Sequence, residues 1–449
     1  MLPNLIGAVP LLLLPDLKLA PPEDPAWDAN AHDSISDPFV WNNSVSPFHI
    51  IYLARFPFMA IGWLLGALIY RWARERSGST AGLLALTLYV FCPNLLAHSR
   101  LVMTDFEPTA CAFFALYAFD RSLRQPASRR WLVLAGIGLG LALASKFSLL
   151  MIAAAIVALT CLEILTTRAN STLIYGFAPA GLPNPAEMQR IWQSATSNET
   201  VNQPGNRSKA LGHEDKFRSL LSLPMSAAMQ RWAARRSVSA AKRLATLFLI
   251  AALTIWGVYF FQIGPVNAGG VPVPAPGFWR EWNSAQYYLN QPWPNYLFGQ
   301  TSTTGWWYYF PIAFVLKTPL PILILLVAAL ARTIIKRAWR NDLIFLIPSF
   351  LIFFSLLFST NNLGYRYLLP LLPLFFIYVA GLWPRSVSHS LNRSATLSPL
   401  HLVTVSLLVW QIVGTLRIYP YYLTFFNELA GGPDHGRYVL SDSNIDWGQ

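Results

Sequence analysis

The stretch LVMTDFEPT, residues 101–109, places two carboxylates, Asp105 and Glu107, between strongly apolar runs. An ionised side chain near hydrocarbon is costly unless it faces water, a cavity or a partner. The rest of the chain largely keeps acidic residues out of such runs. We therefore take this stretch as the first candidate for chemistry and use it to place the apolar segments on either side.

The composition indicates an integral membrane protein. Of the 449 residues, 54% are hydrophobic and only 12% are charged, whereas soluble domains carry roughly 25% charged residues. The net charge of +12 would suit a nucleic-acid partner, but the basic residues lie in short clusters between apolar runs. The positive-inside rule explains such clusters. We therefore exclude nucleic acid as a partner and predict an all-α, polytopic transmembrane helical bundle.

The alternation of apolar runs and basic clusters predicts ten membrane spans. They are residues 50–70, 81–97, 106–119, 131–145, 147–165, 244–261, 311–331, 343–358, 367–383 and 401–416. The apolar run before them, Leu2 to Pro15, is short for a span, so we expect an interfacial or re-entrant helix. The cysteines, Cys92, Cys111 and Cys161, lie in apolar segments without metal-like spacing, and we expect free thiols.

This map divides the chain into five regions. Residues 1–49 form an apolar helix and an acidic loop on the outer face. Residues 50–167 are a first transmembrane group with an outer acidic loop, and residues 168–243 are a basic cytoplasmic loop. Residues 244–416 are a second transmembrane group that carries an aromatic outer loop, 264–310, and residues 417–449 begin a periplasmic tail.

The predicted topology gathers the polar residues of interest on one outer face. Asp105, Lys146, the aromatic loop, the short loop 360–367 and the tail all fall on that side. A channel or a transporter would carry polar residues through the membrane depth. Polar chemistry at one surface instead favours an enzyme that acts on a lipid-borne substrate.

Asp105 is the candidate catalytic residue. Transfer of a group from a lipid phosphate needs an acid that takes the acceptor's proton and cations that stabilise the phosphate leaving group. The alternative role for Asp105 is a cap on the helix that begins at Phe106. Glu107, in the first turn of that helix, is better explained as a partner for the helix dipole.

Three cations are candidates for phosphate or substrate binding. Lys146 follows the small-residue run GIGLGLALA and either snorkels to the headgroups or contacts a phosphate. Arg366 lies in NNLGYRYLLPLLP, at the start of an outer span. Lys317 lies inside a predicted span, where we expect a carboxylate or phosphate to pair with it. Arg55 and Arg100 are weaker candidates and are better explained as interfacial anchors.

Aromatic and tail residues complete the candidate substrate site. Trp306 and Tyr309, in the run GWWYYF, form either an interfacial belt or the wall of a sugar or isoprenoid groove. In the tail, Asp442, Asn444 and Asp446 alternate and would share one face of a strand, where they would bind sugar hydroxyls or a cation. The sequence identifies no certain cofactor, and it does not decide whether a divalent metal takes part.

Four runs make the chain resemble the bacterial phospholipid-carrier-dependent glycosyltransferases, in the superfamily of protein O-mannosyltransferases and lipid A aminoarabinose transferases. They are GWWYYFPIAFVLKTPLP (305–321), YRYLLPLLP (365–373), FFNELAGG (425–432) and DSNIDWGQ (442–449). The resemblance implies the C-type glycosyltransferase fold, a polyprenyl-phosphate sugar donor, and inverting transfer on the periplasmic face of the bacterial inner membrane.

The resemblance also assigns residues. Asp105 looks like the acid of the family's second outer loop, and Lys146 and Arg366 look like members of its polar face. Family members usually carry a further span and an outer loop with a catalytic acidic pair before the run Leu5 to Leu14, so we expect either a misplaced start or a fragment. The tail stops at Gln449 without a helix or cap, so we expect its last feature to be cut short as well. The predicted function is transfer of a sugar from polyprenyl phosphate to a hydroxyl of a protein, lipid or glycan. A flippase or transporter of the same lipid and an inactive scaffold of this fold are the alternatives.

Overall fold

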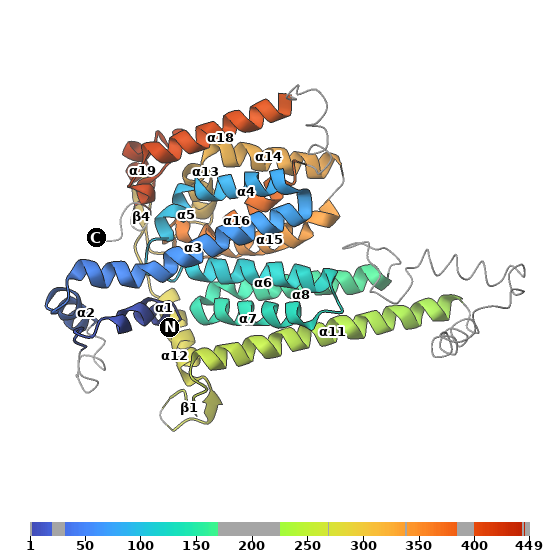
Figure 1. Ribbon diagram of the computed structural model, residues 1–449, viewed down its shortest axis with the longest axis horizontal. Coiled ribbons are helices and arrows are strands. Elements are labelled where there is room, and N and C mark those ends of the chain that lie inside the picture. The colour runs from blue at the N-terminus through green and yellow to red at the C-terminus, as the bar shows by residue number, and fades with distance from the viewer. Residues whose placement is uncertain are drawn as a thin grey trace, which may run out of the picture.

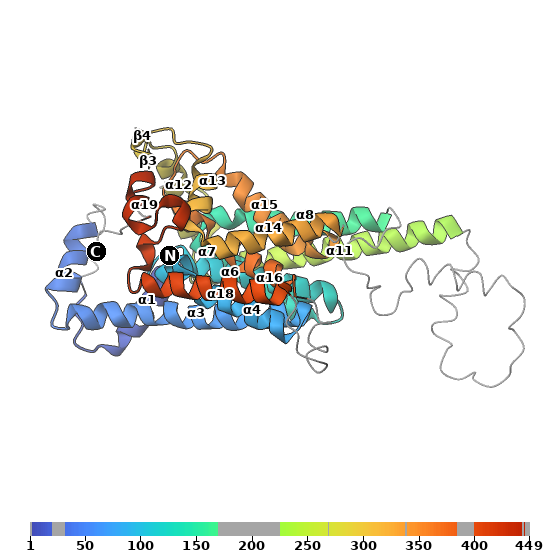
Figure 2. The ribbon, with the colours of Figure 1, turned by 90° about the horizontal axis from the view of Figure 1, so that it is seen from above.

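Long helices lying side by side form the body of the protein, as Figures 1 and 2 show. The computed structural model describes residues 2–19, 32–168, 225–267, 269–336, 339–383, 399–441 and 444. The body consists of α3 (Pro47–Ser77), α4 (Ser79–Val90), α6 (Phe106–Arg124), α7 (Arg129–Ser145), α8 (Leu150–Arg168), α11 (Met225–Val258), α14 (Leu320–Ile335), α15 (Leu343–Leu356), α16 (Leu371–Ala380) and α18 (Pro399–Arg417).

Shorter elements gather at one end of this body, which we call the loop end (Figures 1 and 2). The helices there are α1 (Leu2–Ala8), α2 (His32–Trp41), α5 (Pro93–His98), α12 (Pro276–Leu289), α13 (Tyr309–Lys317) and α19 (Pro433–Val439). Two antiparallel hairpins join them. Strands β1 (Ile263–Pro265) and β2 (Pro272–Pro274) pair Gly264 with Val273, and β3 (Asn295–Leu297) and β4 (Gln300–Ser302) pair Tyr296 with Thr301.

The prediction of an all-α membrane bundle is confirmed. A helix lies at the position of each of the ten predicted spans. Within the described part of the chain, four helical segments are long and apolar enough to cross a membrane alone: Pro47–Ser77, Phe147–Leu165, Ser237–Val258 and Trp339–Leu356. The bent pair α13 and α14 makes a fifth if it counts as one span. The total of ten spans stays a prediction.

Proline breaks two of the predicted spans. The run 81–97 divides into α4 and α5 before Pro93, and the run 311–331 divides into α13 and α14 before Leu320, with an angle of 112° between the two helices. Pro93 is the first residue of α5, where its missing N–H is not needed, and Pro319 lies at the N-cap of α14. Both breaks place irregular backbone close to the loop end.

Small residues bring α7 against two neighbouring helices. A Cβ built on Gly136 would lie 2.7 Å from the Cβ of Ile250, and one on Gly140 would lie 2.6 Å from the carbonyl oxygen of Ala251. A Cβ built on Gly138 would instead lie 3.1 Å from the backbone of Ala115 on α6. The small-residue run therefore packs α7 tightly between α6 and α11.

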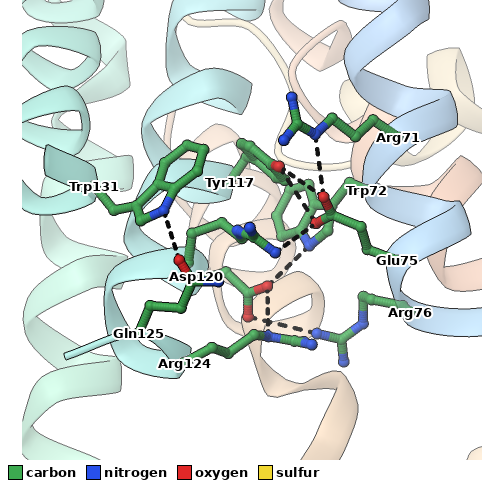
Figure 3. A network of polar contacts seen from close by, with 10 residues as sticks. Arg71, Trp72, Glu75, Arg76, Tyr117, Asp120, Arg124, Gln125 and Trp131 are labelled. Atoms are coloured by element: carbon green, nitrogen blue, oxygen red, sulfur yellow. Dashed lines mark hydrogen bonds and ion pairs between the residues drawn. The ribbon is translucent and has the colours of Figure 1, made fainter. Parts of the chain in front are cut away.

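A buried acid joins α3 to α6 near the C-terminal ends of both helices, away from the loop end. Figure 3 shows the contacts around it. Asp120 is only 1% exposed. It accepts a hydrogen bond of 3.0 Å from the indole nitrogen of Trp72 and pairs with Arg124 at 3.0 Å and Arg76 at 3.5 Å. A second acid, Glu75, pairs with Arg71 and Arg121 and accepts a hydrogen bond from the Tyr117 hydroxyl. We call the residues around these two acids the basic cluster. Four arginines thus meet two acids where the sequence predicts the cytoplasmic side.

Candidate functional site

Asp105 and Lys146 meet because α6 begins and α7 ends at the loop end. Asp105 is the residue before α6, and Lys146 is the residue after α7. The Lys146 ammonium lies 2.5 Å from Oδ1 of Asp105, and Nη1 of Arg366 lies 3.9 Å from Oδ2. The structure therefore brings together the predicted acid and two of the predicted phosphate ligands, from three separate elements.

One aromatic ring supports both cations. The Lys146 ammonium lies 4.2 Å from the centre of the Tyr367 ring, and the Arg366 guanidinium carbon lies 5.4 Å from it. A ring face stabilises a partly desolvated cation by roughly 0.5–2 kcal/mol. Asp105 is buried, whereas the side chains of Lys146 and Arg366 remain 15% and 18% exposed. The two cations are thus more exposed to an incoming anion than the carboxylate is.

The charge balance keeps Asp105 ionised. Burial alone would raise the pKa of this carboxyl, but the charges of Lys146, Arg366 and His98, with the hydrogen bond from Lys146, lower the pKa below its usual 3.8. The side chain makes no capping hydrogen bond to α6. The capping role that we considered for Asp105 is therefore wrong. Its partners are the two cations.

Glu107 lies inside the first turn of α6 and is fully buried. Its Oε1 accepts hydrogen bonds from the Cys111 thiol at 3.1 Å and from the Ser145 hydroxyl at 3.2 Å. Ser145 ends α7 and directly precedes Lys146, so the two acids of the opening stretch contact consecutive residues at this end of α7. The first-turn position agrees with the predicted dipole partner, but the burial and the contact with α7 exceed what that role needs.

Lys317 lies in a second group of polar contacts, which it makes with residues of the tail. Its ammonium donates to the carbonyl oxygens of Leu423, at 2.9 Å, and Asn444, and lies 4.5 Å from the centre of the Phe426 ring. Asn94 donates to the Lys317 carbonyl at 2.6 Å. Among the described residues, two backbone carbonyls contact this cation, and the expected carboxylate does not. The carbonyls stabilise it because a carbonyl oxygen carries partial negative charge without the cost of burying an anion. The expected pairing with a phosphate stays a prediction.

The predicted aromatic residues divide between surface and core. Trp307 is 67% exposed and Trp306 is half-buried, whereas Tyr309 is buried and its hydroxyl accepts a hydrogen bond of 3.0 Å from Asn444. Tyr309 therefore helps to hold the tail near Lys317. Its predicted contact with substrate, like that of Trp306, stays a prediction.

Amide side chains that we did not single out position both Trp306 and the loop before Arg366. Asn362 accepts a hydrogen bond of 2.6 Å from the Trp306 backbone N–H, and Asn295 accepts one of 2.5 Å from the Asn362 backbone N–H. Gly305, the residue before Trp306, has φ +66°, and a Cβ built on it would lie 2.4 Å from Oδ1 of Asn362. The run Asn361-Asn362-Leu363-Gly364, with three turn-forming residues, was the available signal.

His98 is the other residue that the sequence analysis missed. It ends α5, is 3% exposed, and lies within the electrostatic reach of Asp105, Lys146, Lys317 and Arg366. Burial lowers the pKa of His98 to about 4, a shift that Asp105 opposes and the cations reinforce. The imidazole is therefore neutral at pH 7, and it interacts electrostatically with both cation groups.

Asp446, a predicted substrate ligand, lies outside the described residues, as does Asp442. Among the residues that the structure describes, no group of three or more His, Cys, Asp or Glu side chains has the arrangement of a metal site. The divalent metal that the sequence left open thus gains no support from the described region.

Comparison with known families matches part of the chain. The sequence model of the dolichyl-phosphate-mannose-protein mannosyltransferase family matches residues 37–194, which is less than half of the chain. This family lies in the superfamily that the sequence runs resemble. The matched segment holds Asp105 and Lys146, whereas Lys317 and Arg366 lie beyond it. No curated protein and no solved structure matches the chain.

Proposed function

We propose that this protein is a membrane glycosyltransferase that moves a sugar from a polyprenyl-phosphate carrier to a hydroxyl acceptor at the loop end. The observation that carries the proposal is the contact of Asp105 with Lys146 and Arg366. The family match over the segment that contains the first two residues supports it, because that family's name specifies a lipid-phosphate sugar donor. The loop end then faces the periplasm of a bacterial inner membrane, and a protein, lipid or glycan supplies the hydroxyl.

The proposed reaction breaks the bond between the sugar C1 and the phosphate oxygen and forms one between C1 and the acceptor oxygen. The phosphate leaves with the bonding electron pair, and Lys146 and Arg366 stabilise its charge. The acceptor hydroxyl loses its proton to a carboxylate, for which we propose Asp105. Arg366 suits the phosphate because its planar guanidinium donates to two oxygens at once.

Donor binding would also change Asp105. Without donor, the two cations hold the pKa of this carboxylate low, and it is a weak base. A phosphate that takes over Lys146 and Arg366 removes that influence, and burial of Asp105 then raises its pKa. The carboxylate becomes a better proton acceptor only after the donor has bound, which limits proton uptake to the loaded site.

Reconstitution into liposomes tests the activity. Purified protein is given radiolabelled polyprenyl-phosphate mannose in one leaflet, with membrane extract as the source of acceptor. We expect release of free polyprenyl phosphate together with label on an acceptor. Movement of the intact lipid across the bilayer without release would instead establish a transporter and refute the proposal. If the lipid neither moves across the bilayer nor releases polyprenyl phosphate, the protein is the inactive scaffold.

A further inference from the structure

An apolar groove of about 580 Å³ runs along the seam between α3 and the pair α4 and α5. Residues from Met59 to Tyr70 line it on α3, with the spacing of one helix face, and Leu86, Tyr89 and Leu96 line the other side. At 1.5 Å per residue the lined part of α3 is about 17 Å long. That is roughly half of the ~30 Å thickness of a bilayer's hydrocarbon core.

Glycines shape the floor of the groove. A Cβ on Gly66 would lie 2.9 Å from the Tyr89 ring, and one on Gly62 would lie 3.6 Å from the Phe106 ring. The Tyr89 hydroxyl donates to the Gly62 carbonyl at 2.7 Å, so this buried polar atom is satisfied and the floor stays apolar. Phe106 directly follows Asp105. One aromatic ring therefore separates the groove from the stretch that carries the candidate acid.

Two arginines mark the loop end of the groove. Arg100 lines it directly, and Arg55 lies on α3 one helical turn before the lining residue Met59. Arg100 donates to the Pro420 carbonyl at 3.0 Å and lies 5.0 Å from the centre of the Tyr422 ring. Among the described residues neither arginine pairs with a carboxylate. Arg55 lines the neighbouring cavity and interacts electrostatically with Arg100. Positive charge at the end of an apolar groove matches an anionic head on an apolar chain.

We propose that this groove receives the isoprenoid chain of a lipid-phosphate carrier that enters from the bilayer, and that Arg55 and Arg100 are the first cations to meet its phosphate. The inference rests on the proposed function. Lys146 and Arg366 would then take over the phosphate at Asp105. Arg55 and Arg100 thus govern binding of the carrier.

Photolabelling tests the groove independently of catalysis. The full chain in nanodiscs is exposed to polyprenyl phosphate with a diazirine in its chain, and labelled peptides are mapped by mass spectrometry. We expect label on residues 59–70 and 86–96. Ala67 lines the groove at an exposed position, so Ala67→Phe fills it without disturbing the core. We expect roughly tenfold weaker binding, because part of the apolar chain loses its contact surface.

Matched variants separate the groove from general effects. Ala328→Phe makes the same change at an exposed position of α14 outside the groove, and we expect unchanged labelling. The double variant Arg55→Gln and Arg100→Gln removes the cations, and we expect binding to weaken roughly tenfold or more. Arg280→Gln, at an exposed position of α12, is its control and should bind normally.

The outcomes distinguish this proposal from the proposed function. Label in the groove without sugar transfer would reject the enzyme and retain the groove, whereas transfer with equal labelling of wild type and Ala67→Phe would reject the groove and retain the enzyme. Displacement of the probe by phosphatidylglycerol as effectively as by unlabelled polyprenyl phosphate would show a general phospholipid seam. That result would overturn the assignment to the carrier.

Discussion

Replacing Asp105 by asparagine tests the centre of the candidate site. The change keeps the shape of the side chain and removes its charge, which leaves Lys146 and Arg366 facing a neutral group. Breaking a fully buried ion pair costs about 3–5 kcal/mol. Because the two cations keep 15% and 18% of their side-chain surface exposed, water partly replaces the carboxylate, and we expect about 2–3 kcal/mol of lost stability.

The corresponding shift in melting temperature is small but measurable. An unfolding entropy of about 2.1 cal/mol/K per residue makes 1 kcal/mol worth roughly 1 °C in a chain of this length. We therefore expect the midpoint of the detergent-solubilised Asp105→Asn protein to fall by about 2–3 °C. The double variant Asp105→Asn with Lys146→Gln should recover part of that loss, because it removes one unpaired cation. Asp434→Asn, at an exposed acid of α19, is the control.

Activity and pH give the decisive comparison. We expect sugar transfer by Asp105→Asn to fall roughly 10²–10⁴-fold, the usual contribution of a general base, and the double variant to stay inactive despite its recovered stability. The pKa of Asp105 is lower in the folded protein than the ordinary 3.8. Its stabilising contribution is therefore present above that pH and is lost as the pH falls through the folded-state value. Unchanged transfer by Asp105→Asn would refute its role as proton acceptor.

Three further predictions concern other parts of the molecule. Gly305→Ala should lower the thermal midpoint and transfer together, because the new methyl would enter the space of the Asn362 side chain at a positive φ. Gly299→Ala, at φ +78° with nothing near its Cβ, is the control. Asp120→Ala should destabilise the protein by about 3–5 kcal/mol, since it leaves arginines of the basic cluster unpaired, and a guanidinium-dependent unfolding curve would measure this. In a Cys161→Ser background, a cysteine at Ser302 should react with an impermeant maleimide only from outside and one at Ser197 only from the cytoplasm; the opposite pattern would reverse the predicted topology.

The sequence predicts the helices well because apolar runs reflect burial in hydrocarbon or protein. It misplaces their ends where backbone geometry intervenes. Hydropathy continues smoothly through Pro93 and Pro319, but proline fixes φ and lacks an N–H, so helices end before these residues and new ones begin. Apolarity alone did not reveal that α13 and α14 meet at a sharp angle.

The candidate site was predictable where topology alone brings residues together. Asp105 before one helix and Lys146 after the next must lie at the same end of an antiparallel pair. The environment of Lys317 was not predictable, because its carbonyl partners come from residues 106 and 127 positions further along the chain. No local sequence pattern predicts a contact between residues so far apart in the chain. His98 was missed for a similar reason, since its significance comes from charges on other elements.

The small-residue face of α7 has a consequence for how the protein is made. Gly136 and Gly140 leave room for the close approach of α11. This helix follows more than seventy residues later and begins the second half of the bundle. During synthesis α7 must enter the bilayer before its partner has been translated. Lipid chains therefore occupy its glycine face until α11 arrives and displaces them. Assembly of the two halves thus exchanges lipid for protein along the contact between α7 and α11.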